Sequence, residues 1–210
     1  MPGQRTWIVR WPSIDGGYTN QSIGKRSGVG AALAAIIEAK AAPTKKPPFM
    51  IYKQSPHSKD LRKGRYSQHN QTYLLTTVTD QRQPVFADFY LGRIVVNAMR
   101  RQHQQGNVQS LAFVVMPDHL HWLFTLQNDN TLASVMKQVK GTSAYLIQKN
   151  RRERGALHLH QPLWEEGYHD HALRKEEDLQ QLVRYIVANP LRAKLVGKVG
   201  DYPLWDAVWL

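Results

Sequence analysis

The chain has 210 residues, 42% of them hydrophobic, which fits one buried core with room for an appendage rather than two full domains. It contains no cysteine, which excludes a disulfide framework and a thiolate metal site, so any metal must have nitrogen and oxygen ligands. The net charge of +12 favours a polyanionic partner, because basic side chains bind phosphates and release counterions. No apolar run reaches membrane-spanning length, so we expect a cytoplasmic protein that is not secreted.

The basic charge is concentrated near the N-terminus. Residues 1–66 carry twelve Lys and Arg against three acids, and the remainder carries sixteen against thirteen. Residues 1–60 are rich in Gly, Pro, Ser and Lys, and the runs "APTKKPP" and "KQSPHSKD" are typical of linkers. We therefore predict a basic, flexible extension over residues 1–60 and a folded domain over residues 61–210.

The folded part is predicted from hydrophobic periodicity and from turn and cap signals. In chain order we expect a strand at 73–79, a helix at 88–105, a strand at 110–115, a turn at 116–118, a strand at 119–126, a helix at 131–150 with a weak point at Gly141, a strand at 166–174 and a helix at 175–190 ended by Pro190. This βαββαβ-like order with an additional helix is typical of the split βαβ pattern. The sequence therefore predicts an α+β fold, a ferredoxin-like antiparallel sheet with helices on one face.

Two histidines interrupt the apolar run "LAFVVMPDHLHWLF" over residues 111–124. On a strand His119 and His121 project from the same face, and two neutral imidazoles can bind one divalent ion. The alternative is a buried histidine beside a surface one. Two further H-x-H pairs, at 158–160 and 169–171, show that this spacing alone does not identify a metal site. For the pair at 169–171 a structural or DNA-contacting role is favoured over metal ligation.

The last predicted helix carries Tyr185 and, four residues later, Asn189, a spacing that puts two side chains on one helical face. They lie beside the stripe expected to be buried, where they could face a groove next to the sheet. The alternatives are a boundary tyrosine and a helix-end asparagine whose backbone leaves helical geometry before Pro190. Tyr145 is a rival nucleophile, but Gly141 and Lys149, its neighbours four residues away, are not candidate ligands.

Several motifs in this order resemble a known family. "MPDHLHWLF" followed by "RYIVANPLRAKLV" resembles the single-tyrosine HUH transposases, and specifically their domesticated branch, the REP-associated tyrosine transposases. The segments "LRKGRYSQHNQTYLLTTVT", "LWEEGYHDHALR" and "VGDYPLWDAVW" resemble the opening segment, a strand and the C-terminal tail of that branch. The resemblance covers about residues 61–210 and implies an HUH endonuclease fold. The basic segment before Leu61 is not part of the pattern.

The resemblance implies roles for particular residues. His119 and His121 correspond to the metal ligands, Asn189 to a third ligand from the helix, and Tyr185 to a nucleophile that forms a covalent 5′-phosphotyrosine intermediate. Mg²⁺ or Mn²⁺ is the implied cofactor, in keeping with nitrogen and oxygen ligands.

The implied partner is single-stranded or hairpin DNA of the REP or BIME type, bound by a bacterial, nucleoid-associated monomer or homodimer. The residues expected to contact DNA are basic: Arg62, Lys63, Arg65, Arg174, Arg184 and Arg192. Arg151, Arg152 and Arg154 could line the same surface, or be a solvated charge run.

Two other functions stay open at this point. One is a DNA- or RNA-binding regulator on the same fold with weak catalysis, which metal-dependent formation of a covalent protein–DNA adduct would distinguish from the enzyme. The other is a histidine-based phosphoesterase or nucleotide hydrolase. Such enzymes usually need a further histidine in a fixed local pattern or a second equivalent motif packed symmetrically, and "HLHWLFTLQ" supplies no third histidine nearby.

Overall fold

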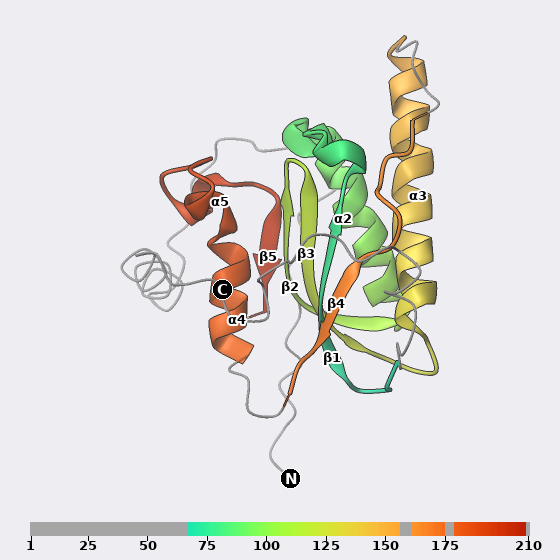
Figure 1. The fold of residues 1–210 in the computed structure, drawn as a ribbon, viewed down its shortest axis with the longest axis vertical. Helices are drawn as coiled ribbons and strands as arrows, with labels where there is room; N and C mark the ends of the chain where they lie inside the picture. The colour runs from blue at the N-terminus through green and yellow to red at the C-terminus, as the bar shows by residue number, and fades with distance from the viewer. Residues whose placement is uncertain (1–66, 156–160, 175–178, 209–210) are drawn as a thin grey trace.

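The computed structural model describes residues 67–155, 161–174 and 179–208, so the predicted extension and its boundary lie outside the described residues. The elements in chain order are β1 (Thr72–Val78), η3 (Asp80–Arg82), η4 (Val85–Ala87), α2 (Phe89–Gln104), β2 (Val108–Met116), β3 (His119–Leu126), α3 (Leu132–Glu153), β4 (His169–Ala172), α4 (Leu179–Val187), α5 (Asn189–Arg192), η5 (Val199–Asp201) and β5 (Trp205–Ala207) (Figure 1). None of these helices is both long and apolar enough to cross a membrane.

The five strands form one antiparallel sheet in the order β4-β1-β3-β2-β5. The first four strands have the predicted ferredoxin-like order, with β3 inserted between β1 and β2, which are joined through α2. The tight connection between β2 and β3 places His119 directly after a turn, as expected. The fifth strand was not predicted, because a three-residue edge strand has too short a pattern to stand out in sequence.

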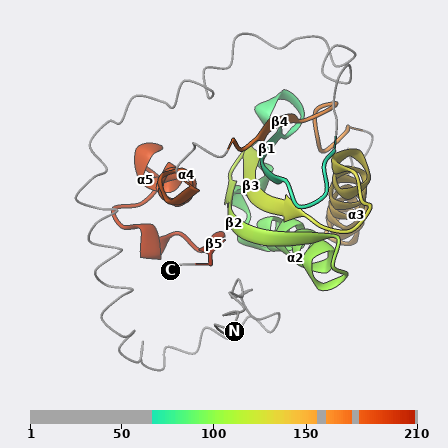
Figure 2. The ribbon, with the colours of Figure 1, turned by 90° about the horizontal axis from the view of Figure 1, so that it is seen from below.

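Helices cover both faces of the sheet, which corrects the expectation that they lie on one face. One hydrophobic cluster joins α2 and α3 to side chains such as Phe113 and Trp122, and a second joins α4 to side chains such as Val114 and Leu123. Because successive strand residues point to opposite faces, these clusters lie on opposite sides of the sheet. Figure 2 shows α4 and α3 on either side of the strands. The continuous apolar run of β2 is the sequence signal for this double coverage.

Side-chain caps fix where the two long helices begin. The Asp88 carboxylate accepts hydrogen bonds from the backbone amides of Tyr90 and Leu91, and the Thr131 hydroxyl accepts one from the amide of Ser134. Helix α3 continues through Gly141 without a break and ends three residues beyond its predicted end. The predicted last helix is divided, because α4 stops at Val187 and α5 starts before the proline.

The C-terminal segment packs along β2 and onto α2. Leu204 accepts a backbone hydrogen bond from Val115, and its side chain lies over Gly92, where an added Cβ would come within 2.4 Å of a Leu204 methyl carbon. Tyr202 donates a hydrogen bond from its hydroxyl to the carbonyl of Val115 at 2.7 Å. These contacts hold the C-terminal segment next to the strand that leads into the histidine pair.

Candidate functional site

The two histidines of β3 lie side by side on the face of the sheet that α4 covers. Their ring centroids are 4.9 Å apart and the rings are nearly perpendicular, at 79°. His121 is 5% exposed, whereas the side chain of His119 is 20% exposed. The predicted juxtaposition of His119 and His121 is therefore present, and both side chains are largely shielded from water.

Each imidazole is held through its Nδ1 atom. Thr76 of β1 is paired directly with His121, and its Oγ1 lies 2.7 Å from His121 Nδ1. The Oδ1 atom of Asp118, in the turn before β3, lies 2.5 Å from His119 Nδ1. If each Nδ1 donates its proton to this oxygen, each Nε2 keeps a free lone pair, the state required of a metal ligand.

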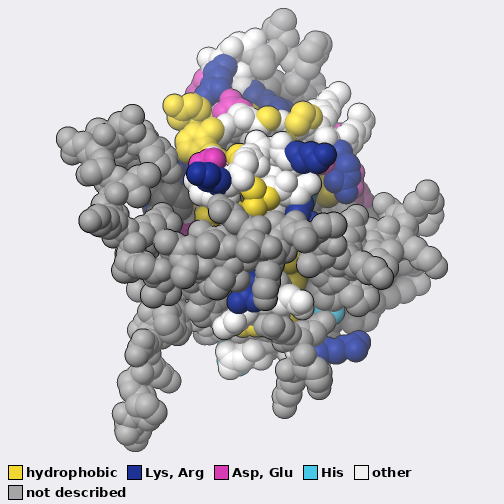
Figure 3. Space-filling model, turned by 90° about the vertical axis from the view of Figure 1, so that its left-hand side faces the viewer, with side chains coloured by type: hydrophobic (Ala, Val, Ile, Leu, Met, Phe, Trp, Pro, Cys, Tyr) yellow, Lys and Arg dark blue, Asp and Glu magenta, His cyan; other side chains and the backbone are white. Residues whose placement is uncertain are grey.

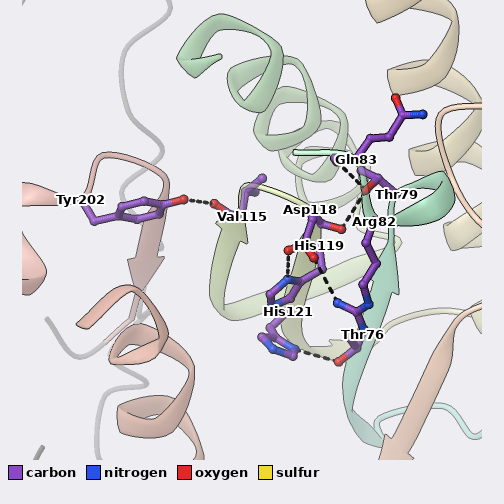
Figure 4. A network of polar contacts seen from close by, with 9 residues as sticks. All are labelled: Thr76, Thr79, Arg82, Gln83, Val115, Asp118, His119, His121 and Tyr202. Atoms are coloured by element: carbon purple, nitrogen blue, oxygen red, sulfur yellow. Dashed lines mark hydrogen bonds and ion pairs between the residues drawn. The ribbon is translucent and has the colours of Figure 1, made fainter. Parts of the chain in front are cut away.

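A short loop supports Asp118 from the other side, as Figure 4 shows. The Arg82 guanidinium pairs with the second carboxylate oxygen of Asp118 at 3.1 Å. The Thr79 hydroxyl lies within hydrogen-bond distance of the carbonyls of Gln83 and Asp118. Arg82 and Gln81 both have positive φ values, +52° and +50°, a strained conformation that these contacts maintain. The loop therefore fixes the carboxylate that orients His119.

The electrostatic environment keeps both imidazoles neutral. Burial lowers the pKa of His121 to about 3, and the nearby positive charges of Arg192 and Arg82 act in the same direction, against the opposing effect of Asp118. Burial also lowers the pKa of His119, against the opposing effect of Asp118. For Asp118, burial acts to raise the pKa, but the interactions with His119 and Arg82 bring it below the usual value. Neutral imidazoles beside a carboxylate suit a divalent cation rather than an anion.

Helix α4 and the turn after it carry the other predicted site residues. The Asn189 side-chain amide donates to the carbonyls of Tyr185 and Ile186 at 3.0 and 3.1 Å, which closes the end of α4 and leaves its Oδ1 oxygen for another partner. The Arg192 guanidinium lies over the Tyr185 ring, 4.1 Å from its centroid. The same guanidinium is close enough to His121 to lower the pKa of that imidazole. Arg192 thus links the tyrosine of α4 to the histidines of β3.

Two other tyrosines are poorly suited to attack a substrate at this site. Tyr145 is 66% exposed on α3, which covers the opposite face of the sheet. Tyr202 lies nearer, but its hydroxyl donates to Val115, and burial raises its pKa to about 12, with a smaller effect of the Asp118 charge. Tyr202 is therefore a packing residue with a satisfied hydroxyl.

Among the described residues, no group of three His, Cys, Asp or Glu side chains could hold a metal ion. Within the described part of the chain, the histidine pair therefore has no third His, Cys, Asp or Glu that completes a metal-binding group, and the amide oxygen of Asn189 is a candidate ligand of another type. Sequence reasoning missed Thr76, Asp118 and Arg82. Asp118 could have been found from its position next to His119, but Thr76 becomes visible only through the register of β1 with β3.

The remaining predicted residues are spread more widely. Arg184 is half-buried on α4, and Arg174 is exposed after β4. The visible part of the face seen in Figure 3 presents Lys and Arg side chains among acidic, neutral and apolar ones. Some of the predicted residues lie outside the described residues: Arg62, Lys63, Arg65, His158 and His160.

Comparison with known proteins gives consistent matches. A family model described as "Transposase IS200 like" matches residues 67–189, more than half of the chain. A REP-associated tyrosine transposase from Escherichia coli K12 is 27% identical over 93 residues, which are 44% of this chain and 50% of the relative. A Haemophilus influenzae protein provisionally given the same description is 24% identical over 135 residues, 62% of this chain and 76% of the relative.

One solved structure, of a REP-associated tyrosine transposase bound to a REP hairpin, superposes with a TM-score of 0.53 and 23% identity, and the match covers 67% of this chain and 79% of that one. At that identity the match establishes the shared fold. The matched segment spans only half the length of the Escherichia coli relative. The resemblance to REP-associated tyrosine transposases is confirmed by these relatives.

Proposed function

Because this chain belongs to the IS200-like transposase family, we propose that it is a metal-dependent endonuclease and strand transferase that cuts single-stranded DNA beside a REP-type hairpin through a covalent 5′-phosphotyrosine intermediate. Family membership supports a transposase that acts on DNA. The finer proposal takes its substrate class from the descriptions of the matched relatives and its chemistry from the residues around the histidine pair.

The observation that carries the proposal is the position of Arg192. Its guanidinium lies over the Tyr185 ring and also acts electrostatically on His121, which supports a shared site for Tyr185 and the histidine pair. A phosphodiester repels anionic nucleophiles, and a positive charge at this point would reduce that repulsion. The guanidinium would also stabilise the negative charge on the attacking phenolate oxygen.

The metal-binding role falls to His119 and His121 through their Nε2 atoms and to Asn189 through its Oδ1 atom. Thr76 and Asp118 contact the two Nδ1 atoms, so each Nε2 would be available to a metal ion when Nδ1 carries the proton. Mg²⁺ or Mn²⁺ bound there would supply Lewis-acid stabilisation of a phosphate oxygen. The neutral state of both histidines at physiological pH is the state that this role needs.

Tyr185 would act as the nucleophile. Its phenolate oxygen attacks the phosphorus, the new bond joins tyrosine to the 5′ phosphate, and the bond from phosphorus to the 3′ oxygen breaks. The phenol proton passes to solvent, and the departing oxygen takes up a proton to become a free 3′-hydroxyl. Because the phosphotyrosine keeps a phosphodiester bond, attack by a 3′-hydroxyl can later rejoin a strand without an external energy source.

The proposal is tested with a labelled hairpin that carries single-stranded flanks, incubated with the full chain and Mn²⁺ and resolved on a denaturing gel. We expect a shifted, denaturation-resistant band that Tyr185→Phe and chelation both abolish. Tyr145→Phe is the matched control, because it removes an exposed hydroxyl from the opposite face, and should leave the band unchanged. A band that survives Tyr185→Phe but disappears in Tyr145→Phe would overturn the assignment, and DNA binding without any band would favour the regulator.

A further inference from the structure

The second H-x-H pair of the described chain lies on the same face of the sheet as the first. In the antiparallel register, His169 of β4 is paired with Thr76, and Thr76 is paired with His121. Directly paired residues of neighbouring strands point to the same face, so the three side chains form one row across β4, β1 and β3. His171 occupies the equivalent position in the next row of that face, opposite Leu74.

The two histidine pairs do not form a common metal site. Among the described residues, no three His, Cys, Asp or Glu side chains form a group that could hold a metal ion. This applies to the four histidines of the two pairs and also to the pair on β4 with its neighbours. A metal site of their own is therefore disfavoured, and a larger ligand that extends from the first pair to the second fits better.

The half of the sheet face around β1 and β4 carries more polar side chains than the half that α4 covers, although Leu74 of β1 and the partly buried Leu173 belong to the apolar cluster of that face. Helix α4 packs on β2, β3 and β5, where the inward side chains are apolar. On β1 and its neighbours the same face carries Thr72, which bonds to Thr125 at 2.9 Å, together with Thr76 and the half-buried His169 and His171. Donors and acceptors gathered on an otherwise buried sheet face suit a polar ligand.

We propose that His169 and His171 contact the single-stranded DNA next to the cleaved phosphate, and so determine affinity for the flank of the hairpin rather than for its stem. This rests on the proposed function for the identity of the substrate. Imidazoles can hydrogen-bond phosphate oxygens and base edges and can stack on unpaired bases. The exposed Arg174, which follows the strand, extends the same edge with a positive charge.

The test measures binding without cleavage, by fluorescence anisotropy in a Tyr185→Phe background with Mn²⁺. Two labelled DNAs are compared, a hairpin with single-stranded flanks and the same hairpin without them. We expect a double variant, His169→Ala with His171→Ala, to raise the Kd for the flanked hairpin roughly tenfold, the scale of one lost base contact. The Kd for the blunt hairpin and the Kd for Mn²⁺ should not change.

His103→Ala is the matched control, because this half-buried histidine lies on α2, on the other face of the sheet, and should leave all three constants unchanged. Equal losses for the flanked and blunt hairpins, no loss at all, or weaker Mn²⁺ binding would each overturn the proposal. The outcome is distinct from that of the cleavage assay. If the double variant weakens binding of the flanked hairpin but no covalent adduct forms, the cleavage proposal fails and the proposed flank contact stands. If an adduct forms but the double variant has no effect on the flanked hairpin, the flank contact fails and the cleavage proposal stands.

Discussion

Replacing Thr76 by valine removes the hydroxyl that holds His121 while keeping the shape of the side chain. The Thr76 oxygen lies 2.7 Å from His121 Nδ1, and both residues are buried. A buried polar group left without a partner costs about 1–3 kcal/mol. In the variant the imidazole can also move its proton to Nε2, which must then be displaced before a metal binds. We therefore expect the Kd for Mn²⁺ to rise about 10- to 100-fold, the usual effect of losing such a supporting contact.

The assay is calorimetric titration of the full chain with Mn²⁺, and Thr72→Val is the control. Thr72 lies on the same strand and the same face, but its hydroxyl bonds to Thr125 instead of a histidine. Its loss should leave the Kd within about twofold of the original, because substitutions at separate sites act independently. Equal Mn²⁺ affinities for the two variants would refute the reasoning that the Thr76 hydroxyl prepares His121 for a metal.

Three further predictions address stability and catalysis. Burial lowers the pKa of His121 to about 3, so between pH 6.5 and 3 the unfolded chain binds a proton that the folded chain does not. The free energy of unfolding should therefore fall on acidification by up to about 1.4 kcal/mol per pH unit, and urea midpoints that do not change between pH 7.5 and 5 would contradict this. Gly141→Ala should raise the free energy of unfolding by about 0.5–1 kcal/mol, because no atom lies within 4 Å of the position that the added Cβ would take. Gly92→Ala should lower the free energy of unfolding by about 1–3 kcal/mol, because its Cβ would crowd Leu204 of the C-terminal segment. A higher urea midpoint for Gly92→Ala than for Gly141→Ala would be evidence against this packing. Arg192→Gln should slow covalent adduct formation about tenfold, the cation–π scale, without weakening Mn²⁺ binding; an unchanged rate would remove Arg192 from the chemistry of Tyr185.

Sequence patterns predicted the long helices, the first four strands and the order of those strands, but not the short fifth strand or the division of the last helix. The strand over 119–126 has its predicted bounds, and the helices predicted over 88–105 and 131–150 end within three residues of the observed ones. Turn and cap residues such as Asp88 and Thr131 fix these ends locally, so they can be read from a single segment. Which face α4 covers depends on the packing of distant segments, and that part of the prediction was wrong.

Part of the candidate site could likewise be predicted from the sequence, and part of it could not. The proximity of His119 and His121 follows from strand geometry alone. Asn189 bonds to the backbone carbonyl of Tyr185 and not to its side chain, so the shared face of these two side chains stays a prediction. The partners of the histidines do not follow, because Thr76 is 45 residues from His121 and meets it only through strand register. The same register reveals that His169 shares a face with His121, which no spacing within one motif could indicate.

The central claim is that Tyr185 is the residue that becomes joined to DNA. The most direct measurement is mass spectrometry of peptides from the full chain after reaction with Mn²⁺ and a flanked hairpin, followed by nuclease trimming of the bound strand. We predict a single modified peptide in which Tyr185 carries a nucleotide through its 5′ phosphate. A nucleotide attached to Tyr145, Tyr202 or a histidine would contradict the account.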